Sequence, residues 1–274
     1  MSYYSLISLM PKAQPLLLDA YPSASVAYSL RKLRTAYSGN CIRVRRTDNT
    51  EQDIAFNSSG QLDTVALLAF VGTGALDNGF VTTWYDQSGN GNNGTQTTAI
   101  RQPLIVSAGV VNVLNGKPSI LSNSTFTSLQ SINPFTFSQV YISTVFNRIA
   151  RVGINDALYI WNGSPFNLLY SNTTFWTGFF GGGTQNTNIP LSVNQKLLTQ
   201  NNNGTTNIYY DNSVQASSGI VAFTITNKNL EIFGYTPSAY GTRGNMQEFI
   251  MYGTSQSSNR AGIETNINSF YTIY

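Results

Sequence analysis

The chain has 274 residues, of which only 10% are charged, and a formal net charge of +3. This length allows one large all-β domain or two small ones, with a core that needs neither a disulfide nor a metal. The sequence contains one cysteine, Cys41, and no histidine, which excludes an internal disulfide and every catalytic or zinc site that uses histidine. Any hydrolytic chemistry must therefore use the 12 Asp and Glu residues.

The N-terminus, MSYYSLISLMPKAQP, carries an apolar stretch between Ser5 and Met10 that is too short to span a membrane. No basic residue precedes this stretch, so it is a poor export signal. We expect residues 1–20 to form an extended arm that docks on another protein, and residues 21–274 to form a single domain. A β-protein of extracellular character without an export signal is typical of phage structural proteins, although a secreted protein whose signal has been removed gives the same pattern.

Two segments, Ser25–Tyr37 and Ser255–Tyr271, have apolar residues at intervals of three and four, as on one face of a helix. These positions are Val26, Leu30, Leu33 and Tyr37 in the first segment, and Ile263, Ile267, Phe270 and Tyr271 in the second. We therefore predict a short helix in the N-terminal region and another helix near the C-terminus.

Basic residues gather between positions 31 and 46. They are Arg31, Lys32, Arg34, Arg43, Arg45 and Arg46. Such a cluster can attract phosphate or an anionic sugar. A solvated face or a contact with a neighbouring subunit is the simpler interpretation, and because no nucleic-acid motif accompanies the cluster we predict no nucleic-acid partner.

Short apolar or alternating runs, separated by turn residues, predict strands through most of the chain. These runs are Ile42–Arg46, Val65–Phe70, Val81–Tyr85, Ile105–Val113, Ser138–Phe146, Leu158–Trp161, Leu168–Ser171, Lys196–Thr199, Thr206–Tyr210, Ala222–Ile225, Leu230–Phe233 and Gln247–Tyr252. The clearest hairpin signal is Asn203-Gly204. Regular short strands with this punctuation indicate an all-β sandwich or jelly roll.

The segment Trp84–Gln96, WYDQSGNGNNGTQ, contains many residues that tolerate unusual backbone angles. Gly89, Gly91 and Gly94 adopt positive φ without steric strain, and the asparagines between them are the next most tolerant residues. This density predicts one defined folded loop. Within it, we expect Asp86 to accept backbone amides in an Asx-type turn, with a sugar hydroxyl or calcium as the alternative ligands.

Four blocks of the chain, in order, resemble the catalytic domain of the α-L-arabinofuranosidase B family. They are Ala24–Arg46, the loop Trp84–Gln96, Val113–Ser119 and the stretch from Leu230 to Tyr271. The resemblance implies a concanavalin-like β-jelly-roll sandwich. In the family it also implies retaining hydrolysis of terminal arabinofuranose, which needs two carboxyl groups about 5 Å apart.

The sequence departs from the family where the family's two catalytic carboxyl groups lie. The family's nucleophile aligns with Asn172, whose amide cannot form the covalent intermediate. The acid/base segment corresponds to Gly234–Gly244, which has no carboxylate, and its nearest match is Pro237. No Asp or Glu occurs between Ala157 and Tyr210. We therefore predict no catalytic residue in either segment.

The remaining acidic residues have structural interpretations. Glu231 alternates with apolar neighbours and is expected to face solvent, whereas Glu248 lies in the apolar strand MQEFIMY and is expected to be structural. Relocated catalysis by Glu231 and Glu248 together is the alternative. Asp156 and Asp211 lie in turn-like contexts and indicate no chemistry.

The first functional hypothesis is a non-enzymatic virion surface protein: a phage decoration, head-fibre or tail-fibre jelly roll. It would form homo-oligomers, contact other virion proteins through its arm and bind cell-surface glycans. The second is an arabinofuranosidase-like retaining glycosidase with relocated carboxylates, and the third is a secreted lectin. The candidate glycan contacts are Asp86, Asn90, Asn92, Trp161, Asn172, Trp176 and Tyr240, with a buried core position as the alternative for the three aromatic residues. No metal site is predicted, and calcium at Asp86 is the one cofactor considered.

Overall fold

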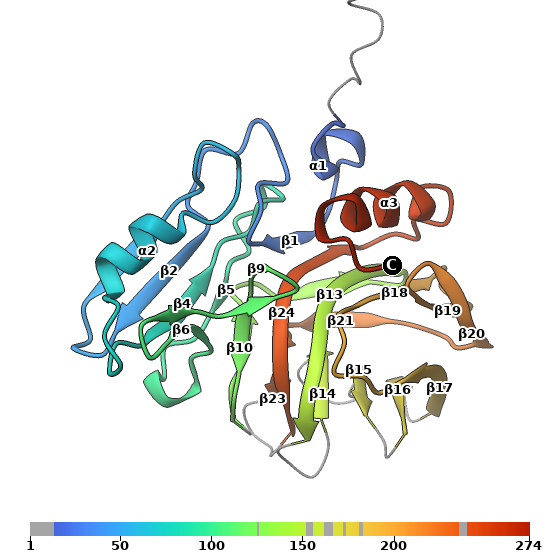
Figure 1. The fold of residues 1–274 in the computed structure, drawn as a ribbon. Coiled ribbons are helices and arrows are strands. Elements are labelled where there is room, and N and C mark those ends of the chain that lie inside the picture. The colour runs from blue at the N-terminus through green and yellow to red at the C-terminus, as the bar shows by residue number, and fades with distance from the viewer. Residues whose placement is uncertain are drawn as a thin grey trace, which may run out of the picture.

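The computed structural model describes residues 14–124, 126–151, 156–161, 167–171, 174–180, 183–235 and 240–274. Over these residues the chain forms two layers of antiparallel strands with helices outside them (Figure 1). This arrangement confirms the predicted all-β, concanavalin-like sandwich. Within the described residues, no helix is both long and apolar enough to cross a membrane.

One layer contains strands from both ends of the sequence. Its order is β1 (Val26–Ser29), β24 (Tyr240–Tyr252), β13 (Val140–Arg151), β18 (Lys196–Asn202), β19 (Thr206–Asp211) and β20 (Val214–Ile220). Asn203 and Gly204 connect β18 to β19, and Gly204 has a φ of 98°. The predicted hairpin is therefore confirmed.

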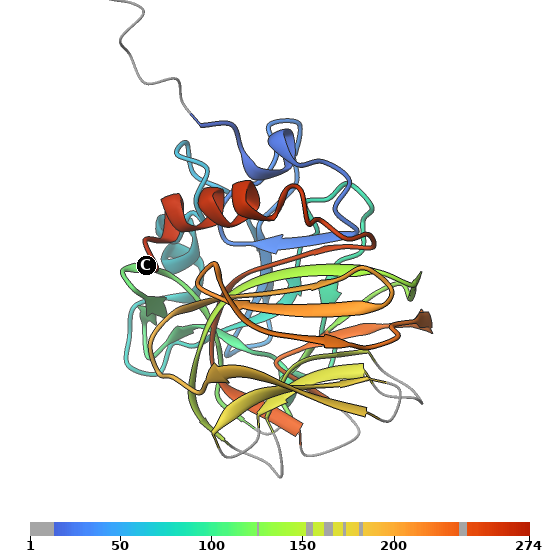
Figure 2. The same cartoon turned by 90° about the vertical axis from the view of Figure 1, so that its right-hand side faces the viewer.

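The facing layer is built from the middle of the chain. Its order is β5 (Gly94–Thr95), β11 (Leu129–Ser131), β22 (Leu230–Ile232), β14 (Asp156–Trp161), β15 (Asn167–Ser171), β16 (Phe175–Phe180) and β17 (Gly183–Pro190). Figure 2 shows β15 to β17 in yellow below the layer that contains β13 and β19, with α3 (Arg260–Tyr271) above that layer.

A lobe of short strands extends from the sandwich beside β24. It contains β2 (Ile42–Arg46), β3 (Glu51–Ile54), β4 (Gly79–Trp84), β6 (Leu104–Ser107) and β7 (Val110–Val111), and β10 (Ile120–Ser122) joins it to β24. The smaller elements are a 3-10 helix at Ala99–Arg101, the pair β8 (Val113–Leu114) and β9 (Lys117–Pro118), the pair β12 (Phe135–Phe137) and β21 (Ile225–Lys228), and β23 (Gly234–Tyr235), which pairs with β24.

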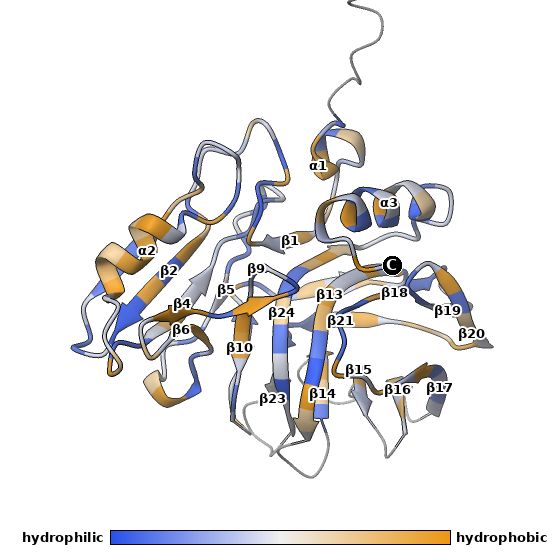
Figure 3. Cartoon of the chain, viewed as in Figure 1, coloured by the Kyte–Doolittle hydropathy of each residue, from blue (hydrophilic) through white to orange (hydrophobic). Residues whose placement is uncertain are grey.

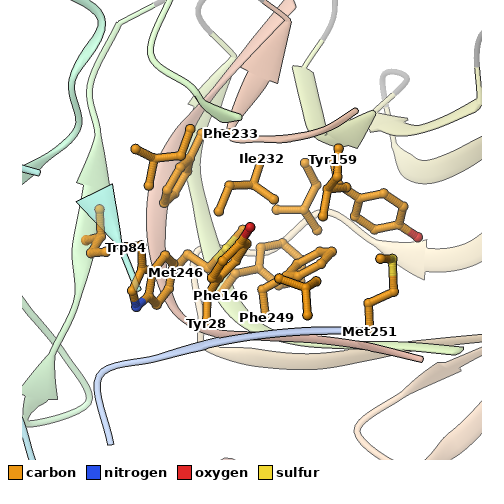
Figure 4. Close-up of a cluster of buried hydrophobic side chains, with 14 of the residues drawn as sticks. Tyr28, Trp84, Phe146, Tyr159, Ile232, Phe233, Met246, Phe249 and Met251 are labelled. Carbon is orange, nitrogen blue, oxygen red and sulfur yellow. The ribbon is translucent and has the colours of Figure 1, made fainter. Parts of the chain in front are cut away.

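The main core lies between the two layers and continues into the lobe. Figure 4 shows Tyr28, Trp84 and Phe249 converging with side chains from the facing layer. The rings of Tyr159 and Phe249 join the layers edge to face, with centroids 5.8 Å apart. Such aromatic pairs add to the stabilisation that comes from burying their large apolar surfaces.

The helix predicted over Ser25–Tyr37 is wrong, because this segment contains the strand β1. Val26 and Tyr28 face the main core, whereas Ala27 packs on the opposite side beneath α3. Since both faces of β1 are apolar, the strand lacks the alternation of apolar and polar residues that identifies a half-buried strand. The short N-terminal helix of the fold is instead α1 (Leu17–Ala20).

The strand predicted over Val65–Phe70 is also wrong, because α2 (Thr64–Val71) occupies this segment. Figure 3 shows α2 as largely apolar, so hydrophobic periodicity could not separate helix from strand. The available signal was Asp63, whose side chain caps the helix by accepting from the backbone N–H groups of Val65 and Ala66. Two further strand predictions hold only in part: Ile105–Val113 is divided among β6, β7 and β8, and only Ile225 of Ala222–Ile225 belongs to a strand.

The predicted docking arm falls largely on residues 1–13, which lie outside the described residues. From residue 14 onward the chain lies against the body. Leu17 and Leu18 are buried beneath α3 with Ile263 and Ile267, and the Leu18 amide donates to the Leu33 carbonyl at 2.8 Å. The packed body therefore includes the end of the segment that the sequence assigns to the arm.

We expect the protein to lose stability in alkaline solution because of its core tyrosines. Burial raises the pKa of several of them, including Tyr28, Tyr141 and Tyr159, well above the ordinary value of 10.0. The folded state keeps these phenols neutral, whereas the unfolded chain ionises them near pH 10. Their contribution is therefore complete below about pH 10 and declines above it. Urea unfolding at about pH 8 and about pH 11 should show a lower midpoint at the higher pH, and equal midpoints would contradict this.

Candidate functional site

The loop Trp84–Gln96 holds β1 in place through Asp86. One oxygen of its carboxylate, Oδ1, accepts from the backbone N–H groups of Ala27 and Ser88, both at 2.9 Å. The other, Oδ2, accepts from the Ser88 hydroxyl at 2.7 Å and the Asn92 amide at 3.0 Å. Four bonds match the four lone-pair positions of a carboxylate. Groups of this chain therefore fill all four acceptor positions of the Asp86 carboxylate. This is the Asx-type arrangement expected from the sequence.

The two predicted asparagines of the loop also bind backbone. The side-chain amide of Asn90 donates to the carbonyl oxygens of Ala24 and Ser25 at 3.0 and 3.1 Å. Asn92 is buried, and its side chain pairs with the backbone of Asn133, accepting at 2.9 Å and donating at 3.3 Å. These contacts account for the loop as a structural device that joins distant segments.

The two predicted tryptophans lie inside the sandwich and are fully buried. Trp161 packs edge to face against Tyr159 and Phe223, and Trp176 packs in the same way against Phe146. Neither indole presents a face on which a sugar could stack. Both tryptophans therefore occupy buried core positions, the alternative given for them in the sequence analysis. Asn172 and the side chain of Tyr240 lie outside the described residues.

Glu231 and Glu248 lie on opposite sides of the main core. Leu230 and Ile232 point into that core, so Glu231 between them points away from it. The expectation that Glu231 faces solvent is wrong: it is 0% exposed and accepts from the Gln130 amide at 3.1 Å. Glu248, in contrast, projects from the outer face of β24, beneath α3. A core layer separates the two carboxylates, so they cannot form the relocated catalytic pair.

Glu248 is the centre of a buried polar network. The Arg31 guanidinium binds it through two nitrogens, at 2.8 and 3.0 Å, and Ser29 donates a hydroxyl at 2.7 Å. Burial alone would lower the pKa of Arg31, but the neighbouring Glu248 carboxylate keeps that pKa above its ordinary value. Burial, reinforced by Glu248, also raises the pKa of Tyr271. These contacts agree with the structural role predicted for Glu248.

The other arginines of the 31–46 cluster each contact a neighbouring group. Arg43 forms ion pairs with Glu51 and Asp53, and Arg46 forms one with Asp48. The Arg45 guanidinium lies 4.5 Å from the ring centroid of Phe80, and Arg34 donates to the Ser88 carbonyl at 3.1 Å. The expected solvated face is wrong for Arg31, which is buried, whereas the side chains of Arg43 and Arg46 are each 39% exposed.

All 12 acidic residues fall within the described part of the chain. Glu51 and Asp53, both on β3, bind the same guanidinium, that of Arg43 on β2, at 2.7 and 3.1 Å. Partial burial, with the hydrogen bond to Asp53, raises the pKa of Tyr85 beside them to about 12. These two carboxylates belong to a partly exposed ion-pair cluster, and none of the described pockets is lined by either of them.

Sequence reasoning missed a polar cluster at the end of the sandwich where β13, β14 and β15 meet. Asp156 is 0% exposed, and its Oδ2 accepts from Arg148 Nε at 2.5 Å and from the Ser171 hydroxyl at 2.6 Å. Its Oδ1 has no hydrogen-bond partner in the part of the chain that the structure describes. Ser171 directly precedes, in the sequence, Asn172, which lies outside the described residues.

Asp156 is far from the next candidate acid. Glu231 pairs in register with Ile160, which lies four residues beyond Asp156 on β14, or about 13 Å along a strand. Retaining glycosidases hold their two carboxyl groups about 5 Å apart and inverting ones about 6.5–9.5 Å apart. This strand end therefore offers one carboxylate, already bound to an arginine, and no partner acid at a catalytic spacing.

No protein-family model matches the chain, and no curated protein matches it. Solved structures do resemble it. A mutant of a GH54 α-L-arabinofuranosidase soaked with 4-nitrophenyl α-L-arabinofuranoside superposes with a TM-score of 0.71 and 16% identity, over 92% of this chain and 64% of that one. An arabinofuranosidase complexed with arabinofuranosyl-α-1,2-xylobiose gives a TM-score of 0.68, 16% identity and the same coverages.

A third structure broadens the comparison. The binding domain of Paraclostridial Mosquitocidal Protein 1 has a TM-score of 0.50 and 17% identity, over 68% of this chain and 49% of that one. This chain spans 64% of the length of the two arabinofuranosidase chains. At these identities the likeness concerns the fold, and the chain is a β-sandwich similar to that of GH54 arabinofuranosidases.

Proposed function

We propose that this chain is a carbohydrate-binding protein without hydrolase activity, carried on the surface of a virion. The observation that supports the absence of hydrolysis is the position of its carboxylates. At the strand end formed by β14 and β15, Asp156 is bound to Arg148 and Ser171 and has no partner acid beside it. Double displacement needs a second carboxyl group as nucleophile or as acid/base. The scaffold similar to a sugar-cleaving enzyme favours a sugar as the ligand that is bound and not cleaved.

We expect no turnover of 4-nitrophenyl α-L-arabinofuranoside, because Asp156 has no partner acid beside it and a core layer separates Glu231 from Glu248. The assay compares the wild type with Asp156→Asn, Glu231→Gln and Glu248→Gln, and follows release of nitrophenol. All four proteins should give the background rate. Turnover by the wild type that one of these substitutions abolishes would establish the alternative function, a glycosidase with relocated carboxylates.

The virion assignment is supported by the sequence. Its charged fraction of 10% and its many polar, uncharged residues suit an exposed β-protein, and residues 1–13 supply an apolar segment ahead of the packed body. In this proposal the protein forms homo-oligomers and contacts other virion proteins through that segment.

Deletion of residues 1–13 tests the docking role. Because Leu17 and Leu18 pack beneath α3, the deletion spares the core and should leave the unfolding midpoint unchanged. Incorporation of the shortened protein into phage particles should fall to background, as measured by its copy number in purified particles. Normal incorporation would contradict docking through this segment, and absence of the full-length protein from particles would favour a secreted lectin.

A further inference from the structure

A pocket of about 350 Å³ lies between α3, the turn that joins β19 to β20, and Tyr274. Pockets that hold small ligands have volumes of about 300–1,000 Å³, so this one suits a single small molecule. Arg260, Glu264 and Asn268 line it from successive turns of α3, because residues four apart lie on one face of a helix. Ser213 and Tyr274 also line it.

Glu264 has an unsatisfied hydrogen-bond acceptor. Its side chain is fully buried, and its Oε2 accepts from the Ser213 hydroxyl at 2.8 Å and from Arg260 Nη1. Its Oε1 has no hydrogen-bond partner among the described residues. A buried polar atom without a partner is destabilising, so a group that donates a hydrogen bond to Oε1 would stabilise the site.

Beside Glu264, the pocket also has a donor and an aromatic ring, each held by further contacts. The Arg260 guanidinium lies 4.0 Å from the ring centroid of Tyr210, which orients it. Asn268 accepts from the backbone N–H of Ile273 at 2.7 Å and so fixes the turn that carries Tyr274. The Tyr274 hydroxyl lies 2.5 Å from that of Ser213, and 51% of the Tyr274 residue surface remains exposed.

We propose that this pocket binds one neutral monosaccharide unit of a glycan, a site that deepens the carbohydrate-binding function proposed above and rests on it. In it, Glu264 Oε1 accepts one sugar hydroxyl, Arg260 donates to a neighbouring hydroxyl, and the Tyr274 ring packs against the sugar. Vicinal hydroxyls match a paired acceptor and donor of this kind. The charges of Arg260 and Glu264 cancel, which favours a neutral ligand over an anion or a cation.

Saturation-transfer difference NMR on the whole protein tests this site with D-galactose, D-glucose, L-arabinose and, as the anionic comparison, N-acetylneuraminic acid. At least one neutral sugar should bind the wild type. Glu264→Gln should weaken that binding by about tenfold or more. In Glu264→Gln, the amide oxygen takes the place of Oε2, because Ser213 and Arg260 both donate to that position. The NH₂ group then takes the place of Oε1, where it cannot accept a hydrogen bond from a sugar.

Two further variants separate this site from folding and from the rest of the protein. Tyr274→Ala removes a half-exposed ring that the core does not need, and should also weaken binding. Asp156→Asn makes the same change of carboxylate to amide in another buried ion pair, and should leave binding unchanged. Binding that survives both Glu264→Gln and Tyr274→Ala would overturn the site while leaving the proposed function standing.

The remaining outcomes also decide the inference. Preference for N-acetylneuraminic acid would overturn the assignment of a neutral ligand, and binding of none of the four sugars would overturn the site. Turnover in the arabinofuranoside assay would overturn the proposed function without affecting a binding loss that maps to Glu264 and Tyr274.

Discussion

Replacing Glu248 with glutamine should lower the free energy of unfolding by about 3–5 kcal/mol. The Arg31 side chain is 8% exposed and binds both Glu248 oxygens beneath α3. Without the negative charge, the guanidinium remains buried with no counter-ion, and desolvation of an unpaired charge is strongly unfavourable. Urea unfolding followed by tryptophan fluorescence should show a lower midpoint with an unchanged slope.

The matched control removes both charges together. The double variant Arg31→Met with Glu248→Leu should recover most of the lost stability, because replacing a buried ion pair with apolar residues of similar size is often close to neutral. A loss of less than about 1 kcal/mol in Glu248→Gln would mean that the pair behaves as a solvated one. A change in turnover without a loss of stability would assign Glu248 to catalysis.

Replacing Asp86 with alanine should also cost about 3–5 kcal/mol. The change strands three backbone N–H groups, those of Ala27, Ser88 and Asn92, and each unsatisfied buried donor costs about 1–3 kcal/mol. Hydrogen exchange provides a local measurement, since the amides of Ala27 and Asn92 should lose protection more than those of β18.

Asp86→Asn is the graded control. It keeps one carbonyl oxygen for Ala27 and Ser88 but turns an NH₂ group toward the Asn92 amide, so we expect an intermediate loss of stability. A stable Asp86→Ala variant that had lost binding of a sugar or of calcium would contradict the structural role and assign Asp86 to a ligand site.

Local patterns predicted much of the fold. The β18–β19 hairpin follows from Asn203-Gly204, and α3 follows from the spacing of Ile263, Ile267 and Tyr271. The two clear errors, β1 and α2, share one physical cause. Each segment is apolar on nearly every side, and periodicity identifies an element only where one face is polar. Asp63 would have corrected α2, whereas only the pairing with β24 reveals β1.

The site residues likewise divide into those whose contacts are local in sequence and those whose contacts come from distant strands. The role of Asp86 was predictable because most of its partners lie within the same short loop. The environments of Asp156 and Glu231 were not, because Arg148 and Gln130 reach them from other strands. The alternation of apolar and polar residues correctly placed Glu231 on the side of β22 that faces away from the core. That this side is buried depends on how the strands assemble, which the local sequence does not reveal.

Because β1 pairs with β24, β1 can form its final hydrogen bonds only after β24 has been synthesised. The bond from the Ser29 hydroxyl to Glu248 joins residues 219 positions apart, so β1 leaves the ribosome long before the strand with which it pairs. Contacts of such long range slow folding to milliseconds or seconds in small proteins. We expect β1 to remain unpaired until β24 has been synthesised, as an apolar strand that needs protection by chaperones during that time.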